Sequence, residues 1–299
     1  MAKIAVVINT WQEEGNIADA IKSAKKVADE IVVVDTYSSD KTVEIARKHG
    51  ALVYLHEYLG YVEPVRNFAV SKAKSDWILI LDADERISDT LADKIKKEVA
   101  KSSADYFTIP RKNIIFGKWI KNSRWWPDYN VRLFKKGHVV WGKTIHAVPE
   151  TAGVGRDFEV KEDYALIHYH YTSVDQYITR LNRYTNVQAK NLIEGGYKFY
   201  WRDLIIKPTN EFLSRYFAGK GYKDGLHGFA LATLQAFSEF VTYLKVWQSG
   251  KFKEEDLGVA RAITQLNTSI KDFNYWKADT LYKETGGIKH AIKRKFKLH

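Results

Sequence analysis

A short apolar run that ends in three acids constrains the fold of this chain most. Residues 77–85 read Trp-Ile-Leu-Ile-Leu-Asp-Ala-Asp-Glu. An uninterrupted run of this length is typical of a strand buried on both faces of a parallel sheet. Because side chains alternate along a strand, we expect Asp82 and Asp84 on one side and Ala83 on the other. Two such carboxylates repel each other unless a cation lies between them, and oxygen ligands favour Mg²⁺ or Mn²⁺. A solvated acidic turn is the alternative.

Strand and helix patterns alternate four times in the first third of the chain. The apolar spacing predicts strands at 3–8, 31–34, 52–55 and 77–81, and helices at 13–26, 42–49 and 66–74. This order predicts an α/β fold with a doubly wound, mostly parallel central sheet flanked by helices.

Polar residues follow the predicted strands at one end of this sheet. Thr10, Asp35, Asp82 and Asp84 come, in chain order, at the ends of three of these strands. Ligands of such sheets bind beyond the carboxyl ends of the strands. The convergence therefore favours a binding site over a solvated turn.

The pattern changes after Asp105. Short strands are predicted at 106–110, 131–134, 139–141 and 145–148, in a region rich in tryptophan. From Ser173 the chain is predicted to be helical. The segment 226–247 is long and apolar, but its charged residues argue against a membrane-spanning helix. A buried or interfacial amphipathic helix is the prediction there.

Composition limits the possible partners. The 299 residues carry a formal net charge of +11 and no cysteine. Disulfides and thiolate metal sites are excluded, which fits a reducing compartment. The N-terminus becomes polar at Asn9, too early for a signal peptide. The charge attracts nucleic acid, anionic lipid or phosphorylated substrates, and a basic stretch near the end could contact an anionic bilayer or could simply be solvated.

Several motifs, taken in order, resemble one enzyme family. The chain resembles the family-two inverting glycosyltransferases of GT-A fold, and among them the bacterial branch that adds sugars to lipopolysaccharide core, a β-1,4-glucosyltransferase-like group. The motifs are T-W-Q-E-E-G-N-I (10–17), V-V-D-T-Y-S-S-D-K-T (33–42), R-N (66–67), L-D-A-D-E-R (81–86), W-P-D-Y-N-V-R-L-F (126–134), H-Y-H-Y (168–171), R-Y-T (183–185) and K-G-Y-K-D-G (220–225).

The resemblance implies roles for single residues. Asp35 would accept a hydrogen bond from the uracil or ribose of a nucleotide sugar, and Thr10 and Glu13 would line that pocket. Asp82 and Asp84 would hold Mn²⁺ or Mg²⁺ on the diphosphate, Asp84 most directly. A metal there would offset the negative charge that grows on the leaving group. Two arginines, Arg66 and Arg132, are candidates for further phosphate neutralisation, or for surface ion pairs.

Inversion also needs a base that removes the acceptor's proton. Related chains carry His-Glu where this chain has His146-Ala147, so the expected glutamate is missing. Asp128 is the first candidate for the base, with Glu85 and Glu150 behind it. His146 is a candidate contact to the metal or phosphate, or a buried structural histidine.

These features together predict a metal-dependent inverting glycosyltransferase that moves a sugar from a UDP-sugar to a hydroxyl of a glycolipid or envelope saccharide. Residues 1–172 would form the catalytic domain, with a nucleotide-sugar half (1–110) and an acceptor half (111–172), and 173–299 a helical extension. We expect a cytoplasmic location at the inner face of the cell membrane, an anionic membrane surface as partner, and no nucleic acid. The alternatives are a polyprenyl-phosphate glycosyltransferase and a catalytically inactive carbohydrate- or nucleic-acid-binding protein.

Overall fold

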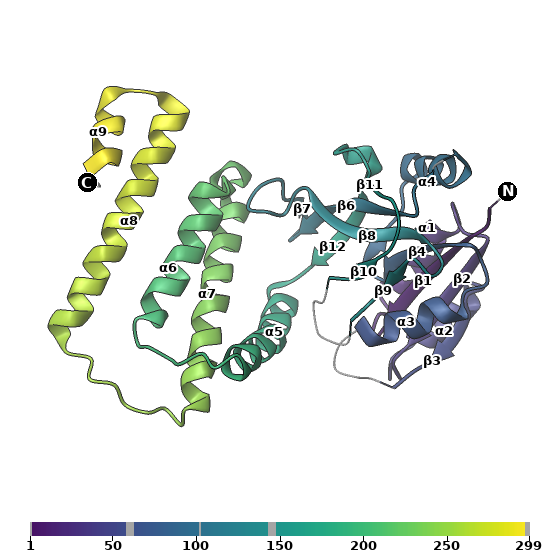
Figure 1. The fold of residues 1–299 in the computed structure, drawn as a ribbon, viewed down its shortest axis with the longest axis horizontal. Helices are drawn as coiled ribbons and strands as arrows, with labels where there is room; N and C mark the ends of the chain where they lie inside the picture. Colours follow the sequence, from purple (N-terminus) through teal and green to yellow (C-terminus); the bar gives the residue numbers. More distant parts are fainter. Residues whose placement is uncertain (1, 58–62, 102, 143–147, 297–299) are drawn as a thin grey trace. The chain divides into compact units, whose positions relative to one another are not determined.

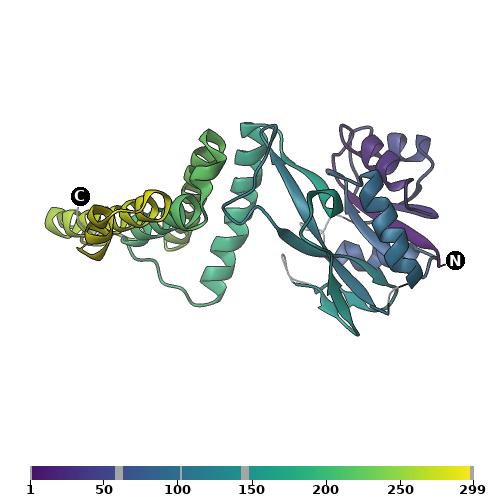
Figure 2. The same cartoon turned by 90° about the horizontal axis from the view of Figure 1, so that it is seen from above.

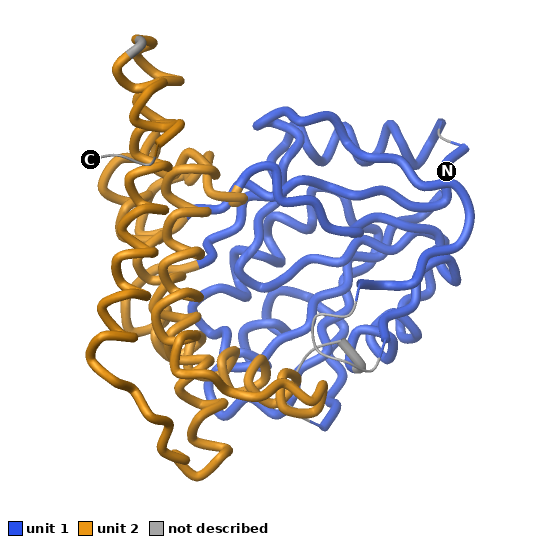
Figure 3. The backbone as a smooth tube through the Cα atoms, turned by 60° about the vertical axis from the view of Figure 1, so that its left-hand side comes forward, with its two compact units in different colours: residues 1–114, 126–170 blue, residues 115–125, 171–299 orange. Residues whose placement is uncertain are grey.

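A computed structural model describes residues 2–57, 63–101, 103–142 and 148–296. The chain forms two compact units, which Figure 3 shows in different colours. Unit 1 comprises residues 1–114 and 126–170, and unit 2 comprises 115–125 and 171–299. A short segment from the middle of the sequence therefore belongs to the same unit as the C-terminal helices.

The first part of unit 1 alternates between strand and helix, as predicted. Its elements in chain order are β1 (Ile4–Thr10), α1 (Ile17–Ala24), β2 (Glu30–Asp35), α2 (Thr42–Lys48), β3 (Leu52–Leu55), α3 (Glu63–Lys72) and β4 (Trp77–Asp82). The strands lie in the order β3-β2-β1-β4 and all pair in parallel (Figure 1). The predicted α/β fold with a parallel central sheet is confirmed.

The second part of unit 1 extends this sheet with antiparallel strands. Strand β8 pairs antiparallel with β4, and β6 pairs antiparallel with β8. The predicted strand at 145–148 lies almost wholly outside the described residues. The elements are β5 (Glu85–Arg86), α4 (Asp89–Lys101), β6 (Tyr106–Ile115), β8 (Asp128–Lys135), β9 (Val139–Val140), β10 (Glu150–Thr151), β11 (Gly155–Asp157), a 3₁₀ helix (Glu162–Tyr164) and β12 (Leu166–Tyr171).

Helices cover both faces of the parallel strands. Side chains at alternate positions of β1, such as Val6 and Ile8, pack with residues of α1 and α4, while Ala5 and Val7 pack with residues of α3. A strand buried on both faces must be apolar at every position, which explains the uninterrupted apolar runs. Each fully buried isoleucine or leucine contributes about 1.5–3 kcal/mol to folding. The core thus holds the carboxyl ends of β1, β2 and β4 at one edge.

In its described residues, unit 2 is helical apart from the short strand Lys118–Trp119 and the last residues of β6 and β12. Helix α7 packs against α5 and α6, and α8 packs against α6 and α9 (Figures 1 and 2). Asp224 accepts hydrogen bonds from the backbone amides of Lys121 and Asn122, which ties the segment 115–125 to this unit. The elements are β7 (Lys118–Trp119), α5 (Val174–Glu194), α6 (Asp203–Leu213), a π-helical turn (Ser214–Ala218), a 3₁₀ helix (Gly221–Asp224), α7 (Leu226–Ser249), α8 (Val259–Thr285) and α9 (Ile288–Phe296).

Two local features of unit 2 follow directly from its sequence. Ser173 caps α5, since its side-chain oxygen accepts a hydrogen bond of 3.1 Å from the amide of Gln176. Gly228 allows α7 to approach the preceding turn, because a Cβ at this position would lie 1.8 Å from the carbonyl oxygen of Gly221. Among the helices that the structure describes, none is long and apolar enough to cross a membrane.

Candidate functional site

Polar residues end the neighbouring strands β1 and β2, as predicted. Thr10 and Asp35 are register partners, and Thr10 Oγ1 donates a hydrogen bond of 2.9 Å to Asp35 Oδ2. Asp35 is fully buried and also accepts from the amide and the hydroxyl of Ser38. Glu13 lies in the loop after β1 and accepts from the side-chain amide of Asn16. The structure therefore brings Thr10 and Asp35 together, while Glu13 contacts other partners.

Asp82, the last residue of β4, lies between two arginines. Arg66 Nη2 is 2.8 Å from Asp82 Oδ1, and Arg132 Nη2 is 2.6 Å from Asp82 Oδ2. Burial disfavours the charged carboxyl, but the charges of Arg132 and Arg66 outweigh this and hold the pKa of Asp82 well below its usual range. Both arginines that the sequence offered for phosphate contacts thus pair with a carboxylate here.

Glu85 is completely buried next to the same arginine. Its Oε1 lies 2.6 Å from Arg132 Nη2, and its Oε2 accepts a hydrogen bond of 2.9 Å from the amide of Asp82. Burial raises the pKa of Glu85 and the charge of Asp82 adds to this rise, while Arg132 opposes it. Both oxygens of Glu85 are engaged, so this side chain supports the interior of the site.

Asp128, at the start of β8, is held by two neighbours from β6. Its Oδ2 lies 2.6 Å from Arg111 Nη2 and accepts a 3.1 Å hydrogen bond from Asn113 Nδ2. Its Oδ1 accepts a longer hydrogen bond of 3.2 Å from Asn130. The side chain is 26% exposed. Arg111 also lies 3.7 Å from Glu85, so ion pairs run continuously from Asp82 to Asp128.

Asp84 departs from the expected geometry. Strand β4 ends at Asp82, and Ala83 and Asp84 form a turn before β5. The alternation of side chains along a strand therefore does not extend to Asp84, and that premise of the sequence analysis was wrong. Asp84 has its own partner instead, since its Oδ2 lies 3.5 Å from His168 Nε2. Asp82 and Asp84 thus contact different groups.

His168 is a candidate that the sequence analysis quoted only as part of a motif. It lies on β12 and is buried, and its Nδ1 is 2.6 Å from Asn113 Oδ1. Because the amide of Asn113 donates to Asp128, its oxygen faces His168, which assigns the proton of the imidazole to Nδ1. Nε2 then faces Asp84. The alternation of His168 and His170 is the signal that could have found it, although no strand was predicted there.

Asp84 and His168 supply one oxygen and one nitrogen donor side by side. Such a mixed pair suits Mn²⁺ better than Mg²⁺, which prefers oxygen ligands. Among the described residues, no group of three or more histidine, aspartate or glutamate side chains could hold a metal by itself. The remaining ligands would have to come from water or from a bound phosphate. His146 and Ala147 lie outside the described residues.

Two buried polar groups near Asp82 lack a partner in the described part of the chain. They are the side-chain amide of Asn9, which is the register neighbour of Asp82, and Nε of Arg132. Buried polar groups are nearly always hydrogen-bonded in native proteins. A bound anion at this edge could accept from Arg132 Nε, so the residues present fit a phosphate.

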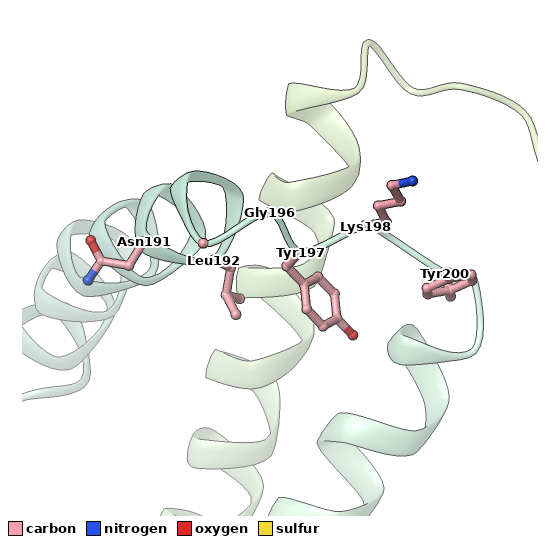
Figure 4. A pocket seen from close by; sticks show the side chains of 7 residues that line it. Asn191, Leu192, Gly196, Tyr197, Lys198 and Tyr200 are labelled. Carbon is pink, nitrogen blue, oxygen red and sulfur yellow. The ribbon is translucent and has the colours of Figure 1, made fainter.

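A separate pocket of about 530 Å³ lies in unit 2, after α5 (Figure 4). Its lining offers no carboxylate or imidazole to a metal. The lining residues are Asn191, Leu192, Gly195, Gly196, Tyr197, Lys198 and Tyr200. It shares no residue with the cluster of acids and arginines in unit 1.

Comparison with known proteins gives consistent relatives. Residues 5–160 match the model of glycosyl transferase family 2. The chain is 35% identical over 255 residues to an uncharacterized glycosyltransferase of Rickettsia typhi, covering 82% of this chain and 87% of that protein. It is 27% identical over 260 residues to the lipopolysaccharide core biosynthesis glycosyltransferase LpsC of Rhizobium meliloti, covering 84% and 94%.

Solved structures are more distant. TarS of S. aureus (residues 1–349) is 15% identical with a TM-score of 0.44, over 85% of this chain and 93% of that one. The mannosyltransferase PcManGT of Pyrobaculum calidifontis, solved with GDP-Man and Mn²⁺, is 16% identical with a TM-score of 0.44, over 99% and 87%.

Proposed function

Because the chain belongs to glycosyl transferase family 2, we propose that it is a metal-dependent, inverting enzyme that uses a UDP-sugar as donor. The observation that carries the proposal is the pairing of Asp84 with His168 at the end of β4, where ligands of parallel sheets bind. Asp84 and His168 would hold Mn²⁺ or Mg²⁺, with Asp82 behind them. The metal, when bound, would stabilise the negative charge of the departing nucleoside diphosphate.

The donor pocket would be formed by the ends of β1 and β2. Asp35 and Thr10 are already hydrogen-bonded to each other, so the carboxylate of Asp35 is fixed in position for a base or ribose. Glu13 would line the same pocket. Arg132 would add one hydrogen bond from Nε to a phosphate, and Arg66 would add charge.

Asp128 would act as the general base. The acceptor oxygen attacks the anomeric carbon, the bond from that carbon to the phosphate oxygen breaks, and the hydroxyl proton passes to Asp128. Oδ2 is already engaged by Arg111 and Asn113, so Oδ1, whose contact among the described residues is the 3.2 Å hydrogen bond from Asn130, is the oxygen that would take the proton. Glu85 is less suited, because it is completely buried with both oxygens engaged.

The acceptor would be a hydroxyl of a glycolipid or envelope saccharide. The relative LpsC is named for the biosynthesis of lipopolysaccharide core, which is the support for this choice. We place the enzyme in the cytoplasm, at the inner face of the cell membrane, with an anionic membrane surface as partner and without nucleic acid. Residues 1–172 would supply the catalytic part and 173–299 the helical part.

Release of nucleoside diphosphate from a panel of UDP-sugars and GDP-sugars, with Mn²⁺ or with chelator, tests this proposal. Water is a poor acceptor, so slow donor hydrolysis does not require the true acceptor. We expect release from one UDP-sugar that is lost with chelator and in Asp84→Ala. Asp19→Ala is the matched control, because this aspartate is 61% exposed on α1. Release that survives chelation contradicts metal dependence. If no sugar is turned over and titration shows no UDP binding with Mn²⁺, the donor assignment is wrong.

A further inference from the structure

The positive charge of the chain is concentrated in one unit. Unit 2 contains 24 lysines and arginines against 12 aspartates and glutamates, whereas unit 1 contains 23 against 24. The net charge of +11 therefore belongs to the helical unit. An excess of this size attracts an anionic macromolecular surface.

Exposed apolar side chains are concentrated in the same unit. Of the 27 large apolar side chains that are well exposed among the described residues, 18 lie in unit 2. Nucleic acid would match the charge but would gain little from exposed valine, leucine and isoleucine. An anionic lipid bilayer matches both, because its headgroups attract the cations and its acyl boundary accepts the apolar side chains.

Helix α8 carries these apolar side chains in one stripe. Val259, Ile263, Leu266, Ile270 and Phe273 follow one another at intervals of four and three residues, which places them on one side of a helix. Their exposed fractions run from 42% to 75%. The stripe is about 21 Å long, from the helical rise of 1.5 Å per residue.

The charges beside this stripe have the sign that an anionic surface requires. No acidic residue occurs between Val259 and Lys271. Lys271 and Lys277 are both exposed, and Lys277 continues the line of the stripe one turn after Phe273. Long lysine side chains can reach headgroups while their carbon atoms stay against apolar surface.

Helix α9 has a similar amphipathic face. Ile292 and Phe296 are 49% and 61% exposed and lie one turn apart, with the exposed Lys289 and Lys295 beside them. Arg294 is used differently, since it pairs with Asp279 of α8 at 3.2 Å. This ion pair ties α9 to α8, so the two helices form one hairpin.

Helix α7, which the sequence predicts to be either buried or interfacial, is less suited. It packs between α5 and α6, and Leu231, Ala236, Tyr243 and Val246 are buried there. Only scattered residues such as Leu226 and Phe237 remain exposed. The structure therefore favours the hairpin of α8 and α9, which includes the basic stretch near the end, over α7 as the candidate membrane contact.

We propose that the α8 stripe, together with Ile292, Phe296 and the lysines of α9, docks the chain on an anionic lipid bilayer. The purpose of this contact rests on the proposed function, in which the acceptor is a membrane glycolipid. The spacing of the stripe would also suit a coiled coil with a second copy. A second copy would bring two strongly cationic units together, so the charge favours lipid.

Co-sedimentation with phosphatidylcholine vesicles, with or without phosphatidylglycerol, tests the proposal on the full chain. Leu266→Glu with Ile270→Glu alters the stripe, and Thr264→Glu with Thr268→Glu adds the same charge on another exposed side of α8. Lys289→Glu with Lys295→Glu removes cations from α9. UDP binding and circular dichroism check that each variant is folded.

We expect the wild-type chain to bind vesicles that contain phosphatidylglycerol and not those of phosphatidylcholine alone. This binding should weaken at high salt. The stripe variant should bind about tenfold more weakly or worse, while the threonine variant stays within about threefold. The lysine variant should lose most of the salt-sensitive binding.

Equal vesicle binding by the stripe and threonine variants overturns the proposal. Failure of the wild-type chain to bind anionic vesicles also overturns it. A wild-type dimer in light scattering that the stripe variant dissociates, without vesicle binding, assigns the face to a second copy. Asp84→Ala should bind vesicles normally, so loss of activity and loss of docking are distinguishable.

Discussion

Asn113 donates a hydrogen bond of 3.1 Å from Nδ2 to Asp128 Oδ2. The other atom of the same amide, Oδ1, lies 2.6 Å from His168 Nδ1. One fully buried side chain therefore fixes both the proposed base and the proposed metal ligand. Such supporting residues typically contribute 10–100-fold to affinity or activity.

Asn113→Ala should therefore change two quantities at once. We expect kcat to fall about 10–100-fold and the Mn²⁺ concentration for half-maximal activity to rise about tenfold. Asn130→Ala is the matched comparison, because Asn130 contacts Asp128 but no described contact joins it to His168. It should lower kcat without changing the Mn²⁺ dependence. Identical metal dependence in both variants would show that Asn113 does not position His168.

His168→Ala should weaken metal binding directly. Loss of the Nε2 donor leaves Asp84 as the nearest ligand, so the Mn²⁺ requirement for UDP release should rise at least about tenfold. His138→Ala is the control, since its half-buried imidazole contacts the backbone carbonyl of Ala152 and no proposed metal ligand. The two variants are compared by titrating UDP release with Mn²⁺ and by measuring Mn²⁺ affinity with calorimetry. An unchanged Mn²⁺ affinity in His168→Ala contradicts the role.

Asp128→Asn should remove the base and keep the donor site. We expect kcat for transfer to fall about 10²–10⁴-fold, while the affinity for UDP with Mn²⁺ stays near that of wild type. Glu85→Gln should instead act through the stability of the interior, because Glu85 pairs with Arg132 and is completely buried. Acceptor-dependent kinetics with thermal unfolding separates these cases. A folded Glu85→Gln that binds UDP but does not transfer sugar would move the base to Glu85.

Asp82→Asn should lower stability in a pH-dependent way. The depressed pKa of Asp82 means that its ionised form stabilises the folded state above the unfolded pKa of roughly 3.9. This contribution is lost as the pH falls through the lower folded value. We expect Asp82→Asn to cost about 1–3 kcal/mol at pH 7 and progressively less below about pH 4. Urea unfolding at both pH values measures the difference. If the stability loss in Asp82→Asn is as large in acid as at pH 7, the loss comes from packing and not from the charge of Asp82.

Gly228→Ala should destabilise unit 2. An added Cβ would lie 1.8 Å from the carbonyl oxygen of Gly221, so α7 or the preceding turn must move. Overpacking of this kind costs about 1–3 kcal/mol or more. Gly15→Ala is the control, because nothing lies within 4 Å of a Cβ there. Thermal unfolding of the two variants should differ clearly, and equal midpoints would show that the backbone can relax.

The parallel sheet could be predicted because its signals are local. The strand at 52–55 has the predicted bounds, β4 differs from prediction by one residue at one end, and β2 differs by one residue at each end. Apolar runs, and the glycine or serine residues that bound them, are patterns of adjacent residues. They can therefore be recognised in a single sequence. Helix α4 was not predicted, although its apolar positions, Leu91, Ala92, Ile95 and Val99, have the spacing of one helix face.

The site could be predicted only in part, since its contacts join distant residues. The apolar run before Asp82 identifies this residue as a candidate. The two arginines that contact it, however, lie 16 and 50 positions away in the sequence. His168 lies 55 positions from Asn113. The antiparallel pairing of β8 with β6 brings Arg111 opposite Asp128, and no short motif records that register. Asp84 was predicted as a partner of Asp82 because side chains alternate along a strand. The turn at Ala83 and Asp84 ends the strand, so this reason does not apply.

The position of segment 115–125 limits where the chain can be truncated or recombined with a relative. Asp224, Arg215 and Gly219 all bind its backbone or side chains, so it folds as part of the helical unit although it is encoded inside the other one. A gene fragment ending at residue 170 would leave this segment without those partners. A single crossover at residue 170 between two relatives would likewise separate the segment from the helical residues that bind it.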